Sequence, residues 1–257
     1  MFISAVIITL NEEANISRCL ASLQGVADEV IIVDSFSKDK TEEISKSFSF
    51  VRFYQQEWLG YSAQKNYANA LATHDTILSI DADEALSEEL TKSILQIKQS
   101  ESESSKVYEV SRLTNYCGSW IKHCGWYPDK KIRIFSKSTI KWQGDFVHET
   151  LALPENIEII HLKGDLLHYS YNNTSSHLQQ LDKFTTLTAQ EAHSKGKRTN
   201  LLGLYFRPKW KFLRDYIFKL GFLDGYAGYQ VCKLSATATF LKYAKLKELN
   251  NNDNTCK

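Results

Sequence analysis

The sequence predicts an α/β protein in which a mostly parallel central sheet is flanked by helices. In the first hundred residues, β-branched apolar runs alternate with segments whose apolar residues recur at helical spacing. Such alternation implies right-handed strand–helix–strand crossovers, and therefore parallel strands. The chain has 257 residues, of which 43% are hydrophobic and 24% are charged. It is long enough to bury a full core, and we expect disorder only at its ends.

The strands and helices of this first part can be assigned in order. Two buried strands are expected in "ISAVIIT" and "EVIIVD", a short third strand in "VRFYQQ", and a fourth strand in "DTILSID". Asp39 and Glu42 stand at capping-box spacing before the helix that follows the second strand. The apolar faces of the helices after strands one and three are expected to be Ile16, Cys19, Leu20 and Leu23, and Ala63, Tyr67, Ala70 and Leu71.

The rest of the chain reads differently. After the polar break "ESESSK", short alternating segments with aromatic and turn residues predict antiparallel additions to the sheet. Beyond Asn172 the pattern is helical, with an expected apolar stripe of Leu178, Leu181, Phe184 and Leu187. We therefore expect two halves of one domain, residues 1–105 and 106–171, followed by a helical extension over residues 172–257.

Several classes of protein are disfavoured by the sequence. The apolar start lacks a basic leader and a cleavage site, and no run reaches the roughly 18 apolar residues that a spanning helix needs. We therefore expect a cytosolic protein. The five cysteines include Cys117 and Cys124, which could ligate zinc with His123, but a fourth ligand at the usual spacing is missing. Free thiols in a reducing compartment are the favoured interpretation.

Charge is distributed unevenly along the chain. The net charge is only +1, yet the segment from Lys195 to Lys247 contains 12 Lys and Arg against two acidic residues. A helix over Trp210–Leu220 would place aromatic and aliphatic residues on one side and Lys211, Arg214 and Lys219 on the other. Such a helix suits an anionic membrane surface, although a helix packed on the core with a solvated basic face is the alternative. No nucleic-acid-binding signature is present.

Polar residues follow the predicted parallel strands at their carboxyl ends, where ligands bind in such sheets. They are Thr9 and Asn11 after strand one, Asp34 and Ser35 after strand two, and Asp81 and Asp83 after strand four. Hard divalent cations are commonly held by one or two carboxylates together with substrate phosphates. Glu84, by contrast, is expected in the solvated first turn of a helix.

Four motifs in order carry a resemblance to a known family. They are "VIITLNEE", "VDSFSKDKT", "GYSAQKNYANALAT" and "ILSIDADE". In this order the chain resembles the inverting, nucleotide-sugar-dependent glycosyltransferases of family two, which have a GT-A type fold. "YPDKKIRIF", "GDFVHE" and "LGFLDGYAGYQ" are similar to the branch that builds lipopolysaccharide core and related surface glycans. The resemblance covers nearly the whole chain.

The resemblance implies roles for the residues that match. Residues 1–105 would bind the nucleotide sugar, and residues 106–171 would form the acceptor side. Nucleotide-binding roles would fall to Thr9, Asn11, Glu12, Asp34, Ser35, Lys65, Asn66 and Asp81. Asp83 would bind Mg²⁺ or Mn²⁺ bridging the diphosphate, with Asp81 beside it. Leu10 stands where many relatives place an aromatic residue that stacks on the base, which leaves the nucleobase open.

Other residues are assigned by chemistry and by analogy. Arg133 could donate to the phosphates or be a solvated strand residue. An inverting transfer needs a base for the acceptor hydroxyl, and the analogy favours Glu149, then Asp145, with His148 orienting the base or reaching the metal. His168 could contact the metal or the diphosphate, or be structural.

The expected activity is transfer of a sugar, from a UDP-sugar by preference, to a glycan or lipid-linked acceptor at the inner face of the cytoplasmic membrane. Two alternatives stay open. One is a sugar nucleotidyltransferase, although "TLNEEANIS" is not the glycine-rich basic loop that such enzymes use. The other is a catalytically silent glycan-binding or scaffold protein with the same fold.

Overall fold

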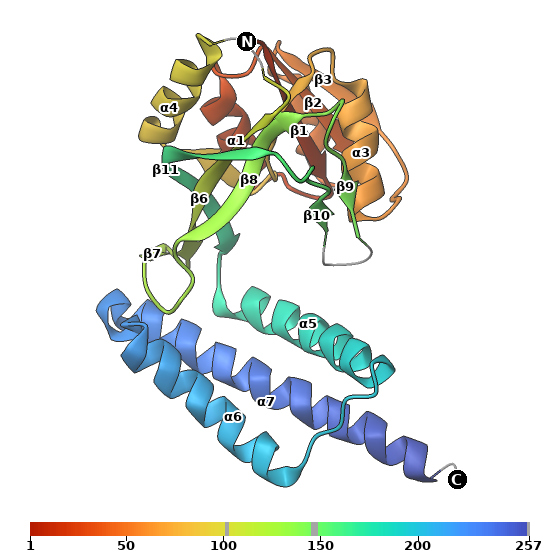
Figure 1. The fold of residues 1–257 in the computed structure, drawn as a ribbon, viewed down its shortest axis with the longest axis vertical. Helices are drawn as coiled ribbons and strands as arrows, with labels where there is room; N and C mark the ends of the chain where they lie inside the picture. Colours follow the sequence, from red (N-terminus) through yellow and green to blue (C-terminus); the bar gives the residue numbers. More distant parts are fainter. Residues whose placement is uncertain (101–102, 145–148, 256–257) are drawn as a thin grey trace. The chain divides into compact units, whose positions relative to one another are not determined.

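The structure is a computed structural model that describes residues 1–100, 103–144 and 149–255 (Figure 1). The chain divides into two compact units. The first comprises Met1–Arg112 and Asp129–Tyr169, and the second comprises Leu113–Pro128 and the chain from Ser170 onward. The three-part division expected from the sequence stays a prediction.

The first unit alternates strands and helices as the sequence predicts. Its opening half contains β1 (Ile3–Thr9), α1 (Ile16–Leu23), β2 (Glu29–Asp34), α2 (Thr41–Lys46), β3 (Val51–Gln55), α3 (Tyr61–Leu71) and β4 (Thr76–Ser79). It continues with β5 (Glu84–Leu86), α4 (Glu88–Lys98), β6 (Lys106–Tyr116), β8 (Asp129–Ser136), β9 (Trp142–Gln143), β10 (Thr150–Leu151) and β11 (Glu158–Tyr171). The last residues of β6 and β11 belong to the second unit.

The strands form a large mixed sheet and a small hairpin. The strand order of the large sheet is β3-β2-β1-β4-β8-β6-β11-β5, with β7 (Ser119–Ile121) paired to β6. Strands β1 to β4 are parallel, whereas β8 pairs antiparallel with β4 and β6, and β5 pairs antiparallel with β11. The predicted antiparallel additions are therefore confirmed. Strand β9 pairs with β10 in the separate hairpin.

Successive side chains of a strand point to opposite faces of the sheet. Both sets are apolar here, so helices pack on both faces. Ile3, Ala5 and Ile7 of β1 pack with α1 and α4 on one face, while Val6 belongs to the cluster that includes α3 on the other. Figure 1 shows helices on both sides of the sheet. The predicted face of α1 is confirmed, because Ile16, Cys19, Leu20 and Leu23 are all buried.

The predicted face of α3 is wrong. Its buried residues are Gln64, Lys65, Ala68 and Asn69, whereas Tyr67 and Ala70 are exposed. Polar side chains can occupy the buried face because the structure supplies partners for Gln64 and Lys65 at the end of the sheet.

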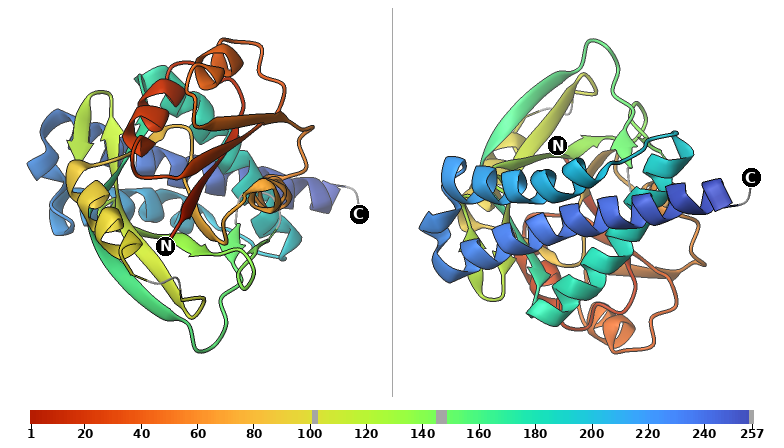
Figure 2. Two further views of the ribbon diagram at one scale, coloured as in Figure 1. Left: turned by 90° about the horizontal axis from the view of Figure 1, so that it is seen from above. Right: turned by 90° about the horizontal axis from the view of Figure 1, so that it is seen from below.

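The second unit is built mainly from helices. They are α5 (Thr174–Ser194), α6 (Leu201–Leu213), a π-helical turn η1 (Arg214–Phe218), a 3₁₀ turn η2 (Gly221–Asp224) and α7 (Gly225–Thr255). Figures 1 and 2 show α7 lying between α5 and α6. None of the helices in the described ranges is long and apolar enough to cross a membrane.

Packing in the second unit differs from the sequence-based expectation for α5. Its buried residues are His177, Leu181, Thr185, Ala189 and Ala192, while Leu178 and Phe184 are exposed. Ala189 and Ala192 pack with Leu246 of α7, and Thr185 accepts a hydrogen bond from Lys245, because two helices approach closely only where side chains are short. The expected apolar stripe is therefore wrong except at Leu181.

Candidate active site

The ends of β1 and β2 are tied together by Asp34. Thr9 Oγ1 donates to Asp34 Oδ1 at 2.9 Å, and the backbone N–H of Ser37 donates to Asp34 Oδ2 at 2.8 Å. The side chain of Asp34 is fully buried. Ser35 follows Asp34 at the end of β2, and its hydroxyl accepts a hydrogen bond from Gln64 Nε2 at 3.3 Å. Both carboxylate oxygens of Asp34 thus hold the chain turn after β2, and its predicted contact with the nucleoside stays a prediction.

The loop after β1 is shaped by Asn11. Its φ of +56° lies in the left-handed region, which Asn adopts more readily than most residues. The N–H of Asn11 donates to Ser37 Oγ, and its side-chain oxygen accepts from the N–H of Lys38. Glu12 follows; burial raises the pKa of its carboxyl group, and the charge of Asp83 raises it further. Glu12 therefore lies in the electrostatic field of the acidic cluster after β4.

That cluster is organised by Arg133 of β8. Arg133 Nη2 lies 2.9 Å from Asp81 Oδ2 and 2.5 Å from Glu84 Oε1. Glu84 also accepts the backbone N–H of Asp81 at 3.0 Å, and Arg112 of β6 lies 3.5 Å from it. Arg112 is held in turn by Asp129 at 2.6 Å. Two arginines from neighbouring strands thus bind the acidic residues that follow β4.

The electrostatic consequences differ between the acidic residues. Burial raises the pKa of Asp81, but the positive charges of Lys65 and Arg133 outweigh it, so the pKa lies well below its usual range. Burial raises the pKa of Glu84, which Arg133 lowers only in part. The pKa of Arg133 is raised because the charges of Glu84 and Asp81 outweigh its own burial. Asp81 is therefore a fixed anion held between two cations.

Asp83 and His168 form the pair of side chains best suited to a metal. His168 Nε2 lies 3.1 Å from Asp83 Oδ2, and the backbone pairing of β5 with β11 places His168 opposite Glu84. A carboxylate and an imidazole fit Mn²⁺, and a carboxylate fits Mg²⁺, with phosphate oxygens completing the coordination. Both oxygens of Asp81 are engaged by Lys65 and Arg133. Within the described ranges, no group of three or more His, Cys, Asp and Glu side chains is arranged to hold a metal by itself.

Lys65 connects Asp81 to the opposite wall of the site. Its Nζ lies 3.3 Å from Asp81 Oδ1 and 3.4 Å from Glu149 Oε1, and 4.5 Å from the ring centroid of Trp142. The residue is only 5% exposed. Asn66 exchanges two hydrogen bonds with the backbone of Trp142, which fixes β9 beside α3. Lys65 is thus a buried cation shared by two carboxylates.

The site brings together most of the residues that the sequence predicts. Thr9 is bonded to Asp34, Lys65 joins Asp81 to Glu149, and Asp83 is paired with His168, while Ser35 is bonded to Gln64 of α3. Asp145 and His148 lie outside the described residues. The expectation that Glu84 is solvated in a helical first turn is wrong, since it is buried in β5 and α4 begins only at Glu88, capped by Ser87.

The structure excludes one of the two interpretations of Arg133, that of a solvated strand residue. Arg133 is 4% exposed and hydrogen-bonded to acidic residues, so it is not a solvated strand residue. Its Nη2 holds carboxylates, while its buried Nε lacks a hydrogen-bond partner in the part of the chain that the structure describes. A contact of Arg133 with phosphate stays a prediction. Sequence reasoning missed Arg112 and Glu84, because the bond between them joins separate strands.

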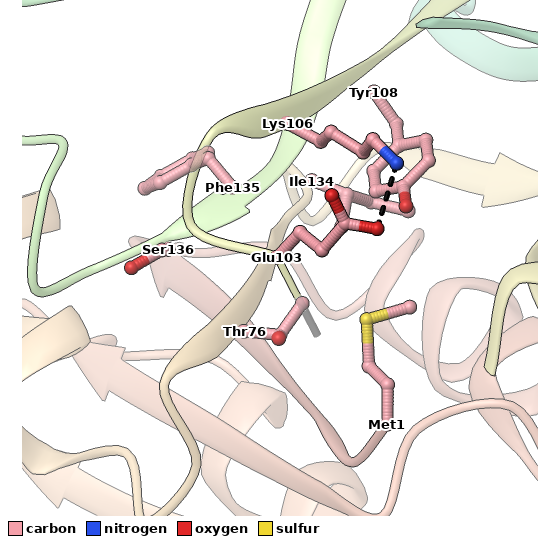
Figure 3. Close-up of a pocket in the computed structure, with 8 residues that line it drawn as sticks. All are labelled: Met1, Thr76, Glu103, Lys106, Tyr108, Ile134, Phe135 and Ser136. Carbon is pink, nitrogen blue, oxygen red and sulfur yellow. Dashed lines mark hydrogen bonds and ion pairs between the residues drawn. The ribbon is translucent and has the colours of Figure 1, made fainter. Parts of the chain in front are cut away.

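A pocket elsewhere in the first unit does not belong to this site. It is lined by Met1, Thr76, Glu103, Lys106, Tyr108, Ile134, Phe135 and Ser136 (Figure 3). Met1 precedes β1 and Thr76 begins β4, so the pocket lies at the amino ends of these strands. An ion pair between Lys106 and Glu103, 2.7 Å long, crosses it. The acidic cluster lies at the opposite, carboxyl ends.

Comparisons with known proteins show which family the chain resembles. A family model described as glycosyl transferase family 2 matches residues 4–120. An uncharacterised glycosyltransferase of Rickettsia typhi is 30% identical over 256 residues, which cover 96% of this chain and 87% of the relative. The lipopolysaccharide core biosynthesis glycosyltransferase LpsC of Rhizobium meliloti is 29% identical over 254 residues, covering 95% and 91%.

A solved structure, that of TarS from S. aureus in complex with UDP-GlcNAc, aligns at a TM-score of 0.49 and 18% identity, covering 98% of this chain and 92% of that chain. The mixed sheet with its parallel half and flanking helices is of the GT-A type. The chain belongs to glycosyl transferase family 2. It is a transferase related to an enzyme of lipopolysaccharide core synthesis.

Proposed function

We propose that this protein is an inverting glycosyltransferase that moves a sugar from a nucleotide diphosphate, a UDP-sugar by preference, to a glycan or lipid-linked acceptor of lipopolysaccharide core or another surface polysaccharide. The observation that carries the proposal is the placement of Lys65, Arg133 and the Asp83–His168 pair around Asp81, at the carboxyl ends of the parallel strands. The similarity to LpsC supports the acceptor class.

The chemistry follows from where charge develops. When the bond between the sugar and the diphosphate breaks, negative charge accumulates on the leaving phosphate, and fixed cations in a poorly hydrated site stabilise it. Lys65 is such a cation, because it is buried and held in place by Asp81 and Glu149. Mg²⁺ or Mn²⁺ bound by Asp83 and His168 would supply the remaining positive charge.

The acceptor hydroxyl must lose a proton on the face opposite the leaving group. We assign this role to Glu149, whose carboxylate precedes β10 and lies next to Lys65. Asp145 is the second candidate, and His148 is proposed to orient the base or reach the metal. Thr9, Asn11, Glu12, Asp34, Ser35 and Asn66 are proposed to shape the nucleotide side of the site.

We further propose that the protein works in the cytoplasm, bound peripherally to the inner face of the cytoplasmic membrane. The excess of basic over acidic residues between Lys195 and Lys247 supports this location, because a Lys or Arg that lies near an anionic leaflet contributes on the order of 1 kcal/mol. A membrane-bound enzyme would meet a lipid-linked acceptor directly.

Calorimetric titration of UDP, GDP and CDP, with and without Mn²⁺, tests the proposal. We expect one nucleotide to bind in a metal-dependent manner, and Asp83→Ala to lose that dependence. Glu43→Ala, which removes an exposed carboxylate from α2, is the matched control and should bind as the wild type does. If folded wild-type protein binds none of the nucleotides, the transferase proposal fails and a scaffold protein becomes the better explanation. Glycan binding without nucleotide or metal would favour that explanation too.

A further inference from the structure

The second unit exposes an unusual amount of apolar surface. Of the large hydrophobic side chains that are exposed in the described ranges, half lie between Leu201 and Tyr229. Six of them form what we call the apolar stripe: Leu202, Phe206, Trp210, Leu213, Ile217 and Phe218. Phe206 and Trp210 are 62% and 57% exposed. Contiguous apolar surface of this kind marks a site of interaction.

The stripe follows from the helical spacing of its residues. Leu202, Phe206, Trp210 and Leu213 are separated by four, four and three positions, so they lie on one side of α6. The unit's own core uses other residues of this region, Phe212 and Tyr216, which pack against Val231 and Cys232 of α7. No residue of α6 is buried. The stripe therefore faces away from the core of its unit.

The exposed charged residues between positions 201 and 229 are all basic. Arg207, Lys209 and Lys219 are exposed, and the Lys209 ammonium lies 4.0 Å from the ring centroid of Tyr205. The two acidic residues between positions 201 and 229 are both engaged inside the unit. Asp215 is buried and bonded to Lys211 and Arg214, and Asp224 accepts hydrogen bonds from Lys122 and His123.

The pairing of Asp215 with Lys211 and Arg214 changes which basic residues can bind an anionic partner. Burial raises the pKa of Asp215, but its bonds to Arg214 and Lys211 outweigh that effect, so the pKa is lowered and the carboxylate stays ionised at neutral pH. Lys211 and Arg214 therefore neutralise a buried acid. Of the three basic residues expected on one side of a helix over Trp210–Leu220, only Lys219 is exposed, and Arg207 and Lys209 of α6 are exposed as well.

We infer that the apolar stripe inserts into the interfacial region of an anionic lipid bilayer, with Lys209 and Lys219 at the level of the headgroups. Aromatic and aliphatic side chains bordered by Lys and Arg suit that region. A second copy of the chain would bring like charges together, which disfavours self-association. The inference deepens the membrane attachment proposed above: insertion of apolar side chains, more than electrostatic attraction, holds the protein.

Insertion and electrostatic attraction respond differently to salt. Raising the salt concentration from about 0.1 M to 1 M shortens the Debye length from about 10 Å to 3 Å, which screens surface charges but leaves apolar contacts in place. We therefore expect the wild-type protein to stay on vesicles at high salt. A protein held by its basic residues alone would be released.

The test is co-sedimentation of the full chain with vesicles of phosphatidylcholine, with and without phosphatidylglycerol. Phe206→Ser with Trp210→Ser should lower the partition coefficient at least about tenfold, because two inserted aromatic side chains are lost. Phe2→Ser with Trp58→Ser, which removes two exposed aromatic residues of the first unit, is the matched control and should bind as wild type does. Leu202→Gln with Ile217→Gln repeats the test without touching an aromatic residue.

Failure of the membrane inference can be distinguished from failure of the sugar-transfer proposal. Nucleotide binding is titrated in solution on the same variants, and we expect it to be unchanged. The inference is overturned if the wild-type protein does not bind anionic vesicles, or if both stripe variants bind as well as the wild type. It is also overturned if sedimentation velocity shows a dimer that the stripe variants abolish, since the stripe would then be a protein interface.

Discussion

Replacing Arg133 with Met tests how strongly the acidic cluster after β4 depends on one guanidinium group. Arg133 Nη2 lies 2.9 Å from Asp81 and 2.5 Å from Glu84. Met has a similar length but no charge, so the variant removes the cation with little loss of volume. Glu84 would then be buried with Arg112, at 3.5 Å, as its nearest described cation. Asp81 would keep Lys65.

The magnitude follows from these distances. At an effective dielectric constant of about 20, Coulomb's law gives about 6 kcal/mol of attraction for each of the two contacts. Desolvation of the buried guanidinium offsets several kcal/mol of that total. Removing one partner of a buried pair leaves an uncompensated charge, and we expect the free energy of unfolding to fall by about 3 to 5 kcal/mol. The free energy of unfolding of natural domains is about 5 to 15 kcal/mol, so this loss would be a large fraction of the total stability.

Urea denaturation measures this effect, and two companion variants make it specific. Glu84→Gln, introduced into Arg133→Met, should restore about 1 to 3 kcal/mol, because it neutralises the charge left unpaired. Arg52→Met in β3 is the control; its ion pair with Glu29 is partly exposed, so the change should be below about 1 kcal/mol. The reasoning would be refuted if Arg133→Met lowered the free energy of unfolding no more than the control does. It would also be refuted if adding Glu84→Gln lowered that free energy further.

The same variant makes a prediction for pH. Burial raises the pKa of Glu84 above that of the unfolded chain, and loss of Arg133 raises it further. A carboxyl group whose pKa is raised by folding favours the folded state when protonated, and that contribution is lost as pH rises through the folded pKa. The difference in free energy of unfolding between the wild type and Arg133→Met should therefore be smaller at about pH 5 than at about pH 8.

Three further predictions concern stability and turnover. Glu29 has a pKa of about 2, since hydrogen bonds to its carboxylate outweigh the effect of burial; its stabilisation is lost as pH falls from its ordinary pKa towards 2. Glu29→Gln should therefore lose about 1 to 3 kcal/mol at neutral pH and show a flatter acid limb in thermal melts. Gly164→Ala should destabilise by more than about 2 kcal/mol, because a Cβ there lies 2.2 Å from the backbone N of Leu90 at a φ of +91°, whereas Gly25→Ala, in open space, should cost only about 1 kcal/mol. Lys65→Gln should lower kcat/KM at least about 100-fold in a sugar-transfer assay, and an unchanged value would remove Lys65 from the site.

Apolar periodicity located the parallel half of the sheet accurately. The strands expected at "ISAVIIT" and "EVIIVD" coincide with β1 and β2, and all four predicted apolar residues of α1 are buried. These elements could be located because their own apolar side chains drive their burial, and the spacing of those side chains is visible within a short segment of sequence. The placement of Asp34 and Asp81 at one edge followed from the same pattern and the geometry of parallel strands.

Helix faces were harder to predict where polar residues are buried. In α3 the buried face contains Lys65, and in α5 it contains Thr185 and Ala189, so hydrophobicity pointed to the wrong side. Lys65 is buried because Asp81 and Glu149 neutralise it. Both partners are distant in sequence, and no local pattern reveals them.

The sequence by itself determined the GT-A type fold, the family and the edge of the sheet at which the acidic residues gather, because these depend on periodicity and on motifs within short segments. Only the tertiary structure decided that Glu84 is a buried partner of Arg133, and that Asp215 neutralises Lys211 and Arg214. The physical reason is that the free energy of a charge depends on its burial and on the charges nearest to it, and folding sets both.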